Sequence, residues 1–236
     1  QLALKLREWK TGRPYLYRPF YEPLAFHLTK FFDHPNSTIT FHIATCIADI
    51  LRAFAPESPY HLTSLAPRVF EFLSACLAPL SNPSDPHYDE ACYILFCVTS
   101  TNAFAVCGGS NRVLPQLVLD LFQVTNRNQD EDLYTMIQTL ISNLIKDSDE
   151  IRDEVLVVPL INMIKPENFQ SDNQRAHALS REIFMTNQKI IQPYLQGNFC
   201  KLFTKRWYAS LLPKVSEIVA AMNGIYMQFT ESVLEQ

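Results

Sequence analysis

The first candidate chemistry in this sequence of 236 residues comes from His42 and Cys46, which are four positions apart and would share one face of a helix. That spacing suits two ligands of a metal ion, but no second pair stands at a matching spacing. We therefore prefer a packing role for both side chains. The glycines of CGGS, at residues 107–110, would suit a phosphate-binding loop, but no strand precedes them and no GK[ST] follows them. We interpret them as a turn between two helices.

The sequence contains no set of residues that would work as a catalytic centre. Nothing in it combines a nucleophile with a base and an orienting group, or pairs two carboxylates in acid and base roles. The acidic run DSDE, at residues 147–150, is interpreted as a helix start with Ser148 as its cap, and an acidic docking site is the alternative. We expect a protein that is not an enzyme and holds no metal or other cofactor.

The stretch APESPY, at residues 55–60, places an acidic residue between two prolines directly after a predicted helix. Pro56 lacks a backbone donor and disfavours helical geometry at Ala55, so the preceding helix should end at or just before Ala55. Glu57 is then held on a short, stiff connection beside the unsatisfied carbonyl groups of the helix end. A stiff loop loses little entropy when a peptide binds to it. From the residues alone, an ordinary turn between helices and a docking site both remain open.

The spacing of apolar residues predicts helices along the whole chain. From Ile39 to Phe54 they recur every three or four positions and define one buried helix face, preceded by Asn36, Ser37 and Thr38 as candidate caps. Only five glycines accompany fifteen prolines, so we expect the prolines to punctuate helices rather than to form β-hairpins. Further helices are predicted from Phe20 to Phe32 and at roughly 62–80, 85–100, 111–125, 129–146, 149–164, 172–187, 188–204 and 211–235.

The predicted helices form a repeating arrangement. Counted in pairs, they advance by about 40 residues per unit, which is the period of HEAT or armadillo arrays. A helix pair of that kind needs neighbours on both sides to bury its apolar face, and short connections favour antiparallel packing. We predict an all-α, HEAT-repeat-like α-solenoid of about five antiparallel helix pairs that forms a single domain over residues 1–236. A compact, irregular helical domain is the alternative.

Composition excludes several classes of partner. The net charge of -4 and a charged fraction of 19% provide no basic surplus to neutralise a phosphate backbone, so we expect no direct binding of nucleic acid. No apolar run is long enough to span a bilayer, and we expect no membrane association. Six cysteines stand at irregular spacing without a CxxC pair, which favours buried, reduced thiols in an intracellular protein. The sequence begins with Gln1 rather than Met, so we expect the true amino terminus to be processed or absent and any targeting signal to lie outside this sequence.

Residues 31–60, FFDHPNSTITFHIATCIADILRAFAPESPY, resemble the amino-terminal region of the Pds-five family (precocious dissociation of sisters, protein five), the HEAT-repeat regulators of cohesin. The family pattern is a helix similar to CIADILR, followed directly by an alanine-proline-acid-alanine-proline segment and an aromatic residue. A second stretch, RAHALSREIFMTNQKIIQPYLQGNF at 175–199, is similar to a helix and turn farther along the family. The resemblance is clearest over residues 20–204, whereas residues 205–236 are helical in pattern but only weakly similar.

The resemblance implies a nuclear, non-enzymatic scaffold and an amino-terminal fragment of a longer protein. Members of the family bind the kleisin subunit of cohesin and control both sister-chromatid cohesion and the release of cohesin from chromatin. The resemblance also implies that the alanine-proline-acid segment binds short peptide motifs of the release factor Wapl, and similar motifs of the protector sororin and the mitotic kinase haspin. In this chain the implied docking residues are Ala55, Pro56, Glu57, Ser58 and Pro59, with Tyr60 adjacent.

These residues have separate expected roles. Glu57 would accept a charge-assisted hydrogen bond from a basic peptide residue, and Tyr60 would add an apolar contact with a polar tip. Ser58 stands where the family pattern usually has alanine, which puts affinity and partner choice in doubt. One alternative is a different helical-repeat adaptor such as a nuclear transport receptor, although Trp9 and Trp207 are the only tryptophans for an importin-type ladder. Another alternative is an enzyme or enzyme subunit built on helical repeats.

Overall fold

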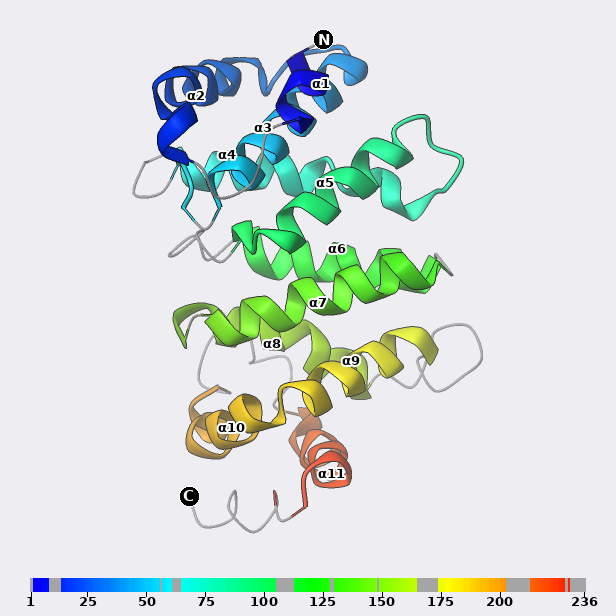
Figure 1. Cartoon of the computed structure of the whole chain (residues 1–236). Helices are drawn as coiled ribbons and strands as arrows, with labels where there is room; N and C mark the ends of the chain where they lie inside the picture. The colour runs from blue at the N-terminus through cyan, green and yellow to red at the C-terminus, as the bar shows by residue number, and fades with distance from the viewer. Residues whose placement is uncertain are drawn as a thin grey trace. The chain divides into compact units, whose positions relative to one another are not determined.

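The computed structural model consists of helices joined by turns (Figure 1). All regular elements in the part of the chain that the structure describes are α-helices or short 3-10 helices. None of these described helices combines the length and the apolar character needed to cross a membrane. The structure describes residues 2–8, 14–55, 57–60, 65–104, 113–127, 130–147, 149–164, 174–202, 213–227 and 229.

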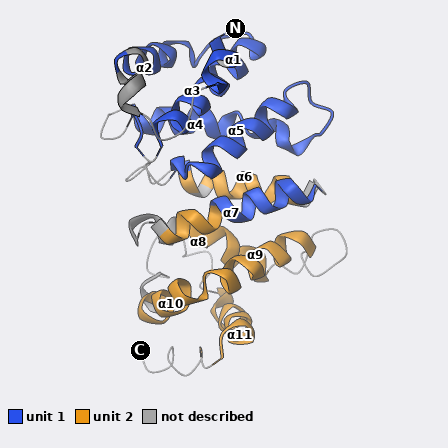
Figure 2. Ribbon diagram, viewed as in Figure 1, with its two compact units in different colours: residues 1–113, 130–140 blue, residues 114–129, 141–236 orange. Residues whose placement is uncertain are grey.

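The chain divides into two compact units (Figure 2). Unit 1 comprises residues 1–113 and 130–140, and unit 2 comprises residues 114–129 and 141–236. The predicted single domain over the whole chain stays a prediction, and the two units are described separately below.

Unit 1 is built around one buried helix, α3 (Ser37–Phe54), which packs against α1, α2 and α5. Ile43, Ile47 and Phe54 are buried as predicted, but Ile39 is 41% exposed. The predicted buried face therefore begins one turn later than the apolar spacing indicated. The other helices of unit 1 are α1 (Leu2–Arg7), α2 (Pro14–Leu28), η1 (Thr29–Phe31), α4 (Ala66–Ala75), η2 (Ala78–Ser81), α5 (Tyr88–Ser100) and the first part of α7 (Glu131–Asp147).

The two ends of α3 follow from local chemistry. Asn36 has extended backbone geometry, and its side chain accepts a hydrogen bond of 3.2 Å from the amide of Ile39. This bond satisfies one of the free amide groups of the first turn. At the other end, Ala55 adopts φ -49° and ψ 138°, as expected of a residue that precedes proline. The prediction that the helix ends just before Ala55 is confirmed.

The prolines do not only punctuate helices, and the sequence-based expectation was wrong on this point. Pro19 and Pro23 lie inside α2, Pro159 lies inside α8, and Pro193 lies inside α10. An interior proline costs about 3 kcal/mol in an isolated helix. Packing of an apolar helix face outweighs local propensity in a folded protein. Because Pro19 does not end the helix, α2 begins at Pro14, well before the predicted start near Phe20.

Unit 2 is organised around α8 (Asp149–Ile164), which packs against α9 and α11. Asn187 lies at the junction between α9 and α10, where the sequence predicted one helix to end and the next to begin. Its buried side-chain amide donates to the Ser142 hydroxyl at 3.0 Å and to the Ile183 carbonyl at 2.8 Å. The remaining helices of unit 2 are α6 (Val113–Arg127), α9 (Gln174–Thr186), α10 (Gln188–Leu202) and α11 (Val215–Ile225).

Candidate peptide-binding site

The loop at residues 55–60 follows the carboxyl end of α3 and lies entirely within unit 1. The amide of Ala55 donates to the carbonyl of Leu51 at 3.0 Å, which closes the last turn of α3. Pro56, which the sequence analysis selected as the helix stop, lies outside the described residues. The remaining five candidate residues are all described.

Among the described residues of the loop, Glu57 is the exposed one. Its amide donates to the carbonyl of Phe54 at 3.0 Å, so the chain folds back directly onto the end of α3. The expectation that Glu57 lies beside unsatisfied carbonyl groups is therefore wrong for Phe54 and for Leu51, which both accept from loop amides. These bonds fix the backbone of Glu57 and leave its carboxylate at the surface.

Ser58 and Pro59 are half-buried behind the exposed glutamate. The hydroxyl oxygen of Ser58 accepts a hydrogen bond of 3.2 Å from the amide of Tyr60. A serine that accepts from the residue two positions later stabilises a local turn. The additional hydroxyl at this position, compared with alanine, thus has a role inside the loop.

Tyr60 anchors the loop to α2 and has 0% of its surface exposed. Its hydroxyl donates to the carbonyl of Ala25 at 3.2 Å, and its ring meets the Phe26 ring edge-on with centroids 6.3 Å apart. Burial raises the pKa of the Tyr60 hydroxyl above its usual range. Tyr60 was expected to contact a partner directly, but its ring has no exposed surface. We therefore infer that Tyr60 positions the loop instead.

Together these contacts define a short loop held at both ends, with one carboxylate presented to solvent. Hydrogen bonds to α3 hold its start, and the buried Tyr60 ring holds its end. A carboxylate in a fixed position can accept a charge-assisted hydrogen bond from an arginine or lysine. The arrangement suits recognition of a basic peptide residue, and the docking role of residues 55–59 stays a prediction.

A buried polar cluster that joins three helices of unit 1 was missed by the sequence analysis. Asp49 is 0% exposed, and one of its carboxylate oxygens accepts from the Tyr93 hydroxyl at 2.6 Å and from Arg52 at 3.2 Å. Arg52 also donates to the carbonyl of Leu6 at 3.1 Å, so the cluster joins α1, α3 and α5. Burial raises the pKa of Asp49. An acid and a base three positions apart inside the apolar run CIADILR were the signal that could have revealed it.

His42 and Cys46, the candidate metal pair, lie on α3 but differ in environment. His42 is exposed, whereas Cys46 is 4% exposed and burial raises the pKa of its thiol to about 11. A thiol binds metal as the thiolate, which this burial disfavours. Within the described residues, no group of three or more His, Cys, Asp or Glu side chains is placed to hold a metal ion.

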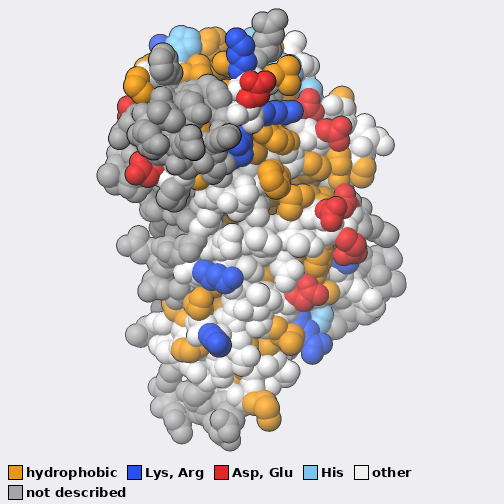
Figure 3. All heavy atoms as spheres, in the orientation of Figure 1, with side chains coloured by type: hydrophobic (Ala, Val, Ile, Leu, Met, Phe, Trp, Pro, Cys, Tyr) orange, Lys and Arg blue, Asp and Glu red, His pale blue; other side chains and the backbone are white. Residues whose placement is uncertain are grey.

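The charged side chains are distributed without a single dominant sign on the face drawn in Figure 3. Lysine and arginine side chains on that face are separated from one another by acidic, apolar and neutral groups. A site on such a face depends on individual charged residues rather than on a broad field of one charge.

Comparison with known proteins gives one family for nearly the whole chain. The family model described as "Sister chromatid cohesion protein PDS5 protein" matches residues 15–236. PDS5 homolog B of Homo sapiens is 26% identical over 223 residues, which cover 92% of this chain and 15% of the human protein. PDS5 homolog A of Gallus gallus is also 26% identical over 223 residues, covering 92% of this chain and 17% of the chicken protein. The chain therefore spans about one sixth of the length of the curated relatives it matches.

Among solved structures, a chain from the Pds5–Scc1 complex has a similar fold. The TM-score is 0.68 with 14% sequence identity, and the likeness covers 99% of this chain and 37% of the other. The prediction of an all-α, HEAT-repeat-like fold is confirmed by this likeness together with the helical elements described above.

Proposed function

The chain belongs to the sister chromatid cohesion protein PDS5 family, and we propose that it is a cohesin-binding helical-repeat module that acts in sister-chromatid cohesion. The observation that carries this proposal is the family match over residues 15–236. The proposed module is a scaffold rather than an enzyme, and its place of action is the nucleus, where chromosomes are held together.

The proposed principal partner is the kleisin subunit of cohesin. This assignment is supported by the similarity in fold to a chain from the Pds5–Scc1 complex, Scc1 being the kleisin. At 14% identity the likeness transfers no individual contact residue. We propose the kleisin as a partner of the module without assigning the residues that bind it.

The second part of the proposal is that residues 55–59 bind a short peptide motif of Wapl and thereby influence the release of cohesin from chromatin. Sororin-like and haspin-like motifs are proposed competitors for the same loop. Support comes from the exposed carboxylate of Glu57 on a loop that hydrogen bonds and the buried Tyr60 ring hold in place. In this proposal, Glu57 accepts from a basic residue of the motif and Tyr60 only positions the loop.

Fluorescence anisotropy with a labelled Wapl peptide from the same organism tests this role. Glu57→Lys should weaken binding at least tenfold, because it places two positive charges against each other; a tenfold change corresponds to about 1.4 kcal/mol. Glu71→Lys is the matched control, since Glu71 is also exposed and lies in unit 1 on α4. Both substitutions change the net charge from -4 to -2, so a non-specific charge effect would appear equally in both.

Circular dichroism must first show that both variants keep the helix content of the wild type. If wild type, Glu57→Lys and Glu71→Lys bound the Wapl peptide equally well, the proposed docking role of the loop would be wrong. A parallel titration with a kleisin peptide shows whether a loss of binding in Glu57→Lys is specific to the Wapl motif. Loss of Wapl binding in Glu57→Lys alone is the predicted result.

A further inference from the structure

A cluster of exposed aliphatic side chains surrounds a pocket in unit 1, on the amino-terminal half of α3. Leu2, Leu4 and Ile39 are 43%, 64% and 41% exposed, and all three line a pocket of about 440 Å³. Large apolar side chains that gather at the surface and are flanked by polar groups mark sites of interaction with other molecules. The pocket is therefore a candidate binding site separate from the loop at 55–60.

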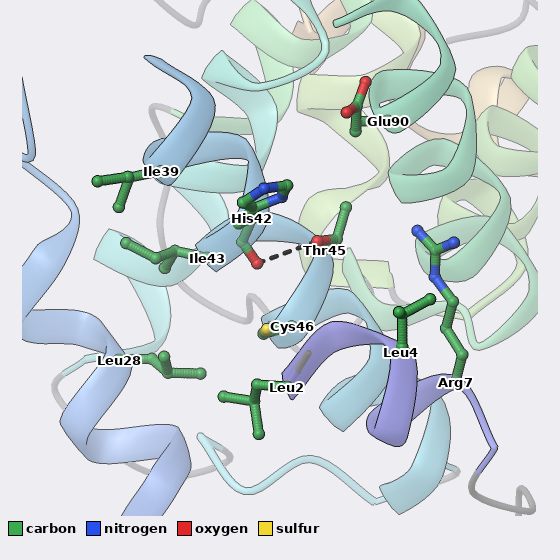
Figure 4. A pocket seen from close by; sticks show the side chains of 10 residues that line it. All are labelled: Leu2, Leu4, Arg7, Leu28, Ile39, His42, Ile43, Thr45, Cys46 and Glu90. Carbon is green, nitrogen blue, oxygen red and sulfur yellow. Dashed lines mark hydrogen bonds between the residues drawn. The ribbon is translucent and has the colours of Figure 1, made fainter. Parts of the chain in front are cut away.

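The floor of this pocket is apolar. Leu28, Ile43 and Cys46 are 7%, 7% and 4% exposed, and each lines the pocket. The pKa of Cys46, raised to about 11 by burial, keeps its thiol uncharged at neutral pH. Thr45 donates its hydroxyl to the carbonyl of His42 at 3.0 Å and is thereby satisfied (Figure 4). An aliphatic or aromatic group would be desolvated here without leaving a polar partner unpaired.

The opposite side of the pocket carries two charges. Figure 4 shows Arg7 and Glu90 facing Leu28, Ile39 and Ile43 across the pocket. The guanidinium of Arg7 lies over the ring of Tyr93, 4.2 Å from its centroid, and is already engaged by this cation–π contact. Glu90 is half-buried in the first turn of α5 and forms no ion pair with any other described residue. Of the two charged groups, Glu90 is therefore the one that we expect to pair with a basic group of a ligand.

We propose that this pocket binds a short segment of a partner protein that inserts one bulky apolar side chain onto the floor and sets a lysine or arginine against Glu90. The negative charge of Glu90 selects a segment with a basic residue. The segment must also be long enough to cover the exposed rim of the pocket. A small molecule confined to the floor would leave Leu4 and Ile39 in water, whereas a peptide segment covers them.

The proposal is independent of the loop at 55–60. None of the described residues that line the pocket belongs to the loop, and its wall residues Leu2, Leu4 and Arg7 lie in α1. The loop follows the carboxyl end of α3, and the pocket residues of that helix lie between Ile39 and Cys46.

Selection from a phage-displayed library of random short peptides on the whole chain tests the proposal. Enriched peptides should share a bulky apolar residue close to a lysine or arginine. Their synthetic versions, measured by fluorescence anisotropy, should bind Leu4→Ser and Ile39→Ser at least about tenfold more weakly. Met185→Ser is the matched control, because Met185 is 56% exposed and belongs to unit 2, whereas the described residues that line the pocket belong to unit 1. Both rim positions are exposed, so these variants should fold.

A charge exchange gives the second readout. Glu90→Lys should lose the basic peptides and bind versions in which the lysine or arginine is replaced by glutamate, while Glu57→Lys should bind the original peptides unchanged. Failure to enrich any peptide that responds to the rim variants overturns the proposal. It is equally overturned if Glu90→Lys leaves the charge preference as it was, or if sedimentation shows a dimer that Ile39→Ser abolishes, because a second copy would then be the occupant.

Discussion

At the scale of single residues, Glu57 and Tyr60 have different roles in the same loop. Glu57 is exposed and offers a charge, whereas Tyr60 is fully buried and fixes the path of the chain. Sequence reasoning placed both residues in one docking segment, which stays a prediction, and it expected Tyr60 to contact the partner directly. The hydroxyl of Tyr60 finds its acceptor on Ala25, 35 positions earlier, and no local pattern could have shown this.

Tyr60→Phe should destabilise the chain by about 0.5–1.5 kcal/mol, because it removes one buried hydrogen bond while keeping the ring. Urea denaturation measures this change. Tyr226→Phe is the matched variant in unit 2, since the Tyr226 hydroxyl donates to the carbonyl of Phe184 at 2.8 Å in a buried setting. The Tyr60 bond would have no energetic role if Tyr60→Phe were as stable as wild type while Tyr226→Phe was not.

The pH dependence of stability provides a second test of the same residue. Burial raises the pKa of Tyr60 above its value of about 10 in an unfolded chain. A raised pKa means that the folded state binds the proton more tightly, so this stabilisation is present below about pH 10 and is lost as the pH rises above it. The free energy of unfolding should fall less steeply above pH 10 in Tyr60→Phe than in wild type. Parallel curves would contradict the prediction.

At the scale of elements, α3 is predictable at both ends and α1 is not. Asn36 and the proline after Ala55 are local signals that mark the limits of α3. Helix α1 has six residues, too few for the spacing of apolar residues to show a period. It is held through Arg52, whose guanidinium donates to the carbonyls of Leu6 and Arg7. Such contacts between distant segments give no signal in a single sequence.

Arg52→Met should release α1 and destabilise unit 1. It removes the donors to α1 and leaves Asp49 buried with only Tyr93 as its described partner, and breaking a buried ion pair costs about 3–5 kcal/mol. Hydrogen exchange of residues 2–8 should become faster. The double variant Asp49→Asn, Arg52→Met removes the stranded charge and should recover part of the stability without restoring protection of α1. Unchanged exchange in Arg52→Met would show that Arg52 does not hold α1.

At the scale of the whole molecule, the helical-repeat fold was predictable from two patterns. The apolar spacing indicated the helices, and the helix-pair length of about 40 residues indicated the repeat. The pocket beside α3 was not predictable, since four separate helices contribute its lining. Ile39 illustrates the difference. Its place in the apolar period indicated a core position, and only the packing of α1 and α2 shows that it lies on the rim of a pocket.

We propose that this chain binds cohesin together with its release factor. The most direct test immobilises a purified cohesin complex assembled with Wapl and measures how much of the chain is retained. We expect saturable retention of wild type and of Glu71→Lys, with at least a tenfold loss of affinity for Glu57→Lys. If the wild-type chain were not retained on this complex, the proposed binding to cohesin and Wapl would be wrong.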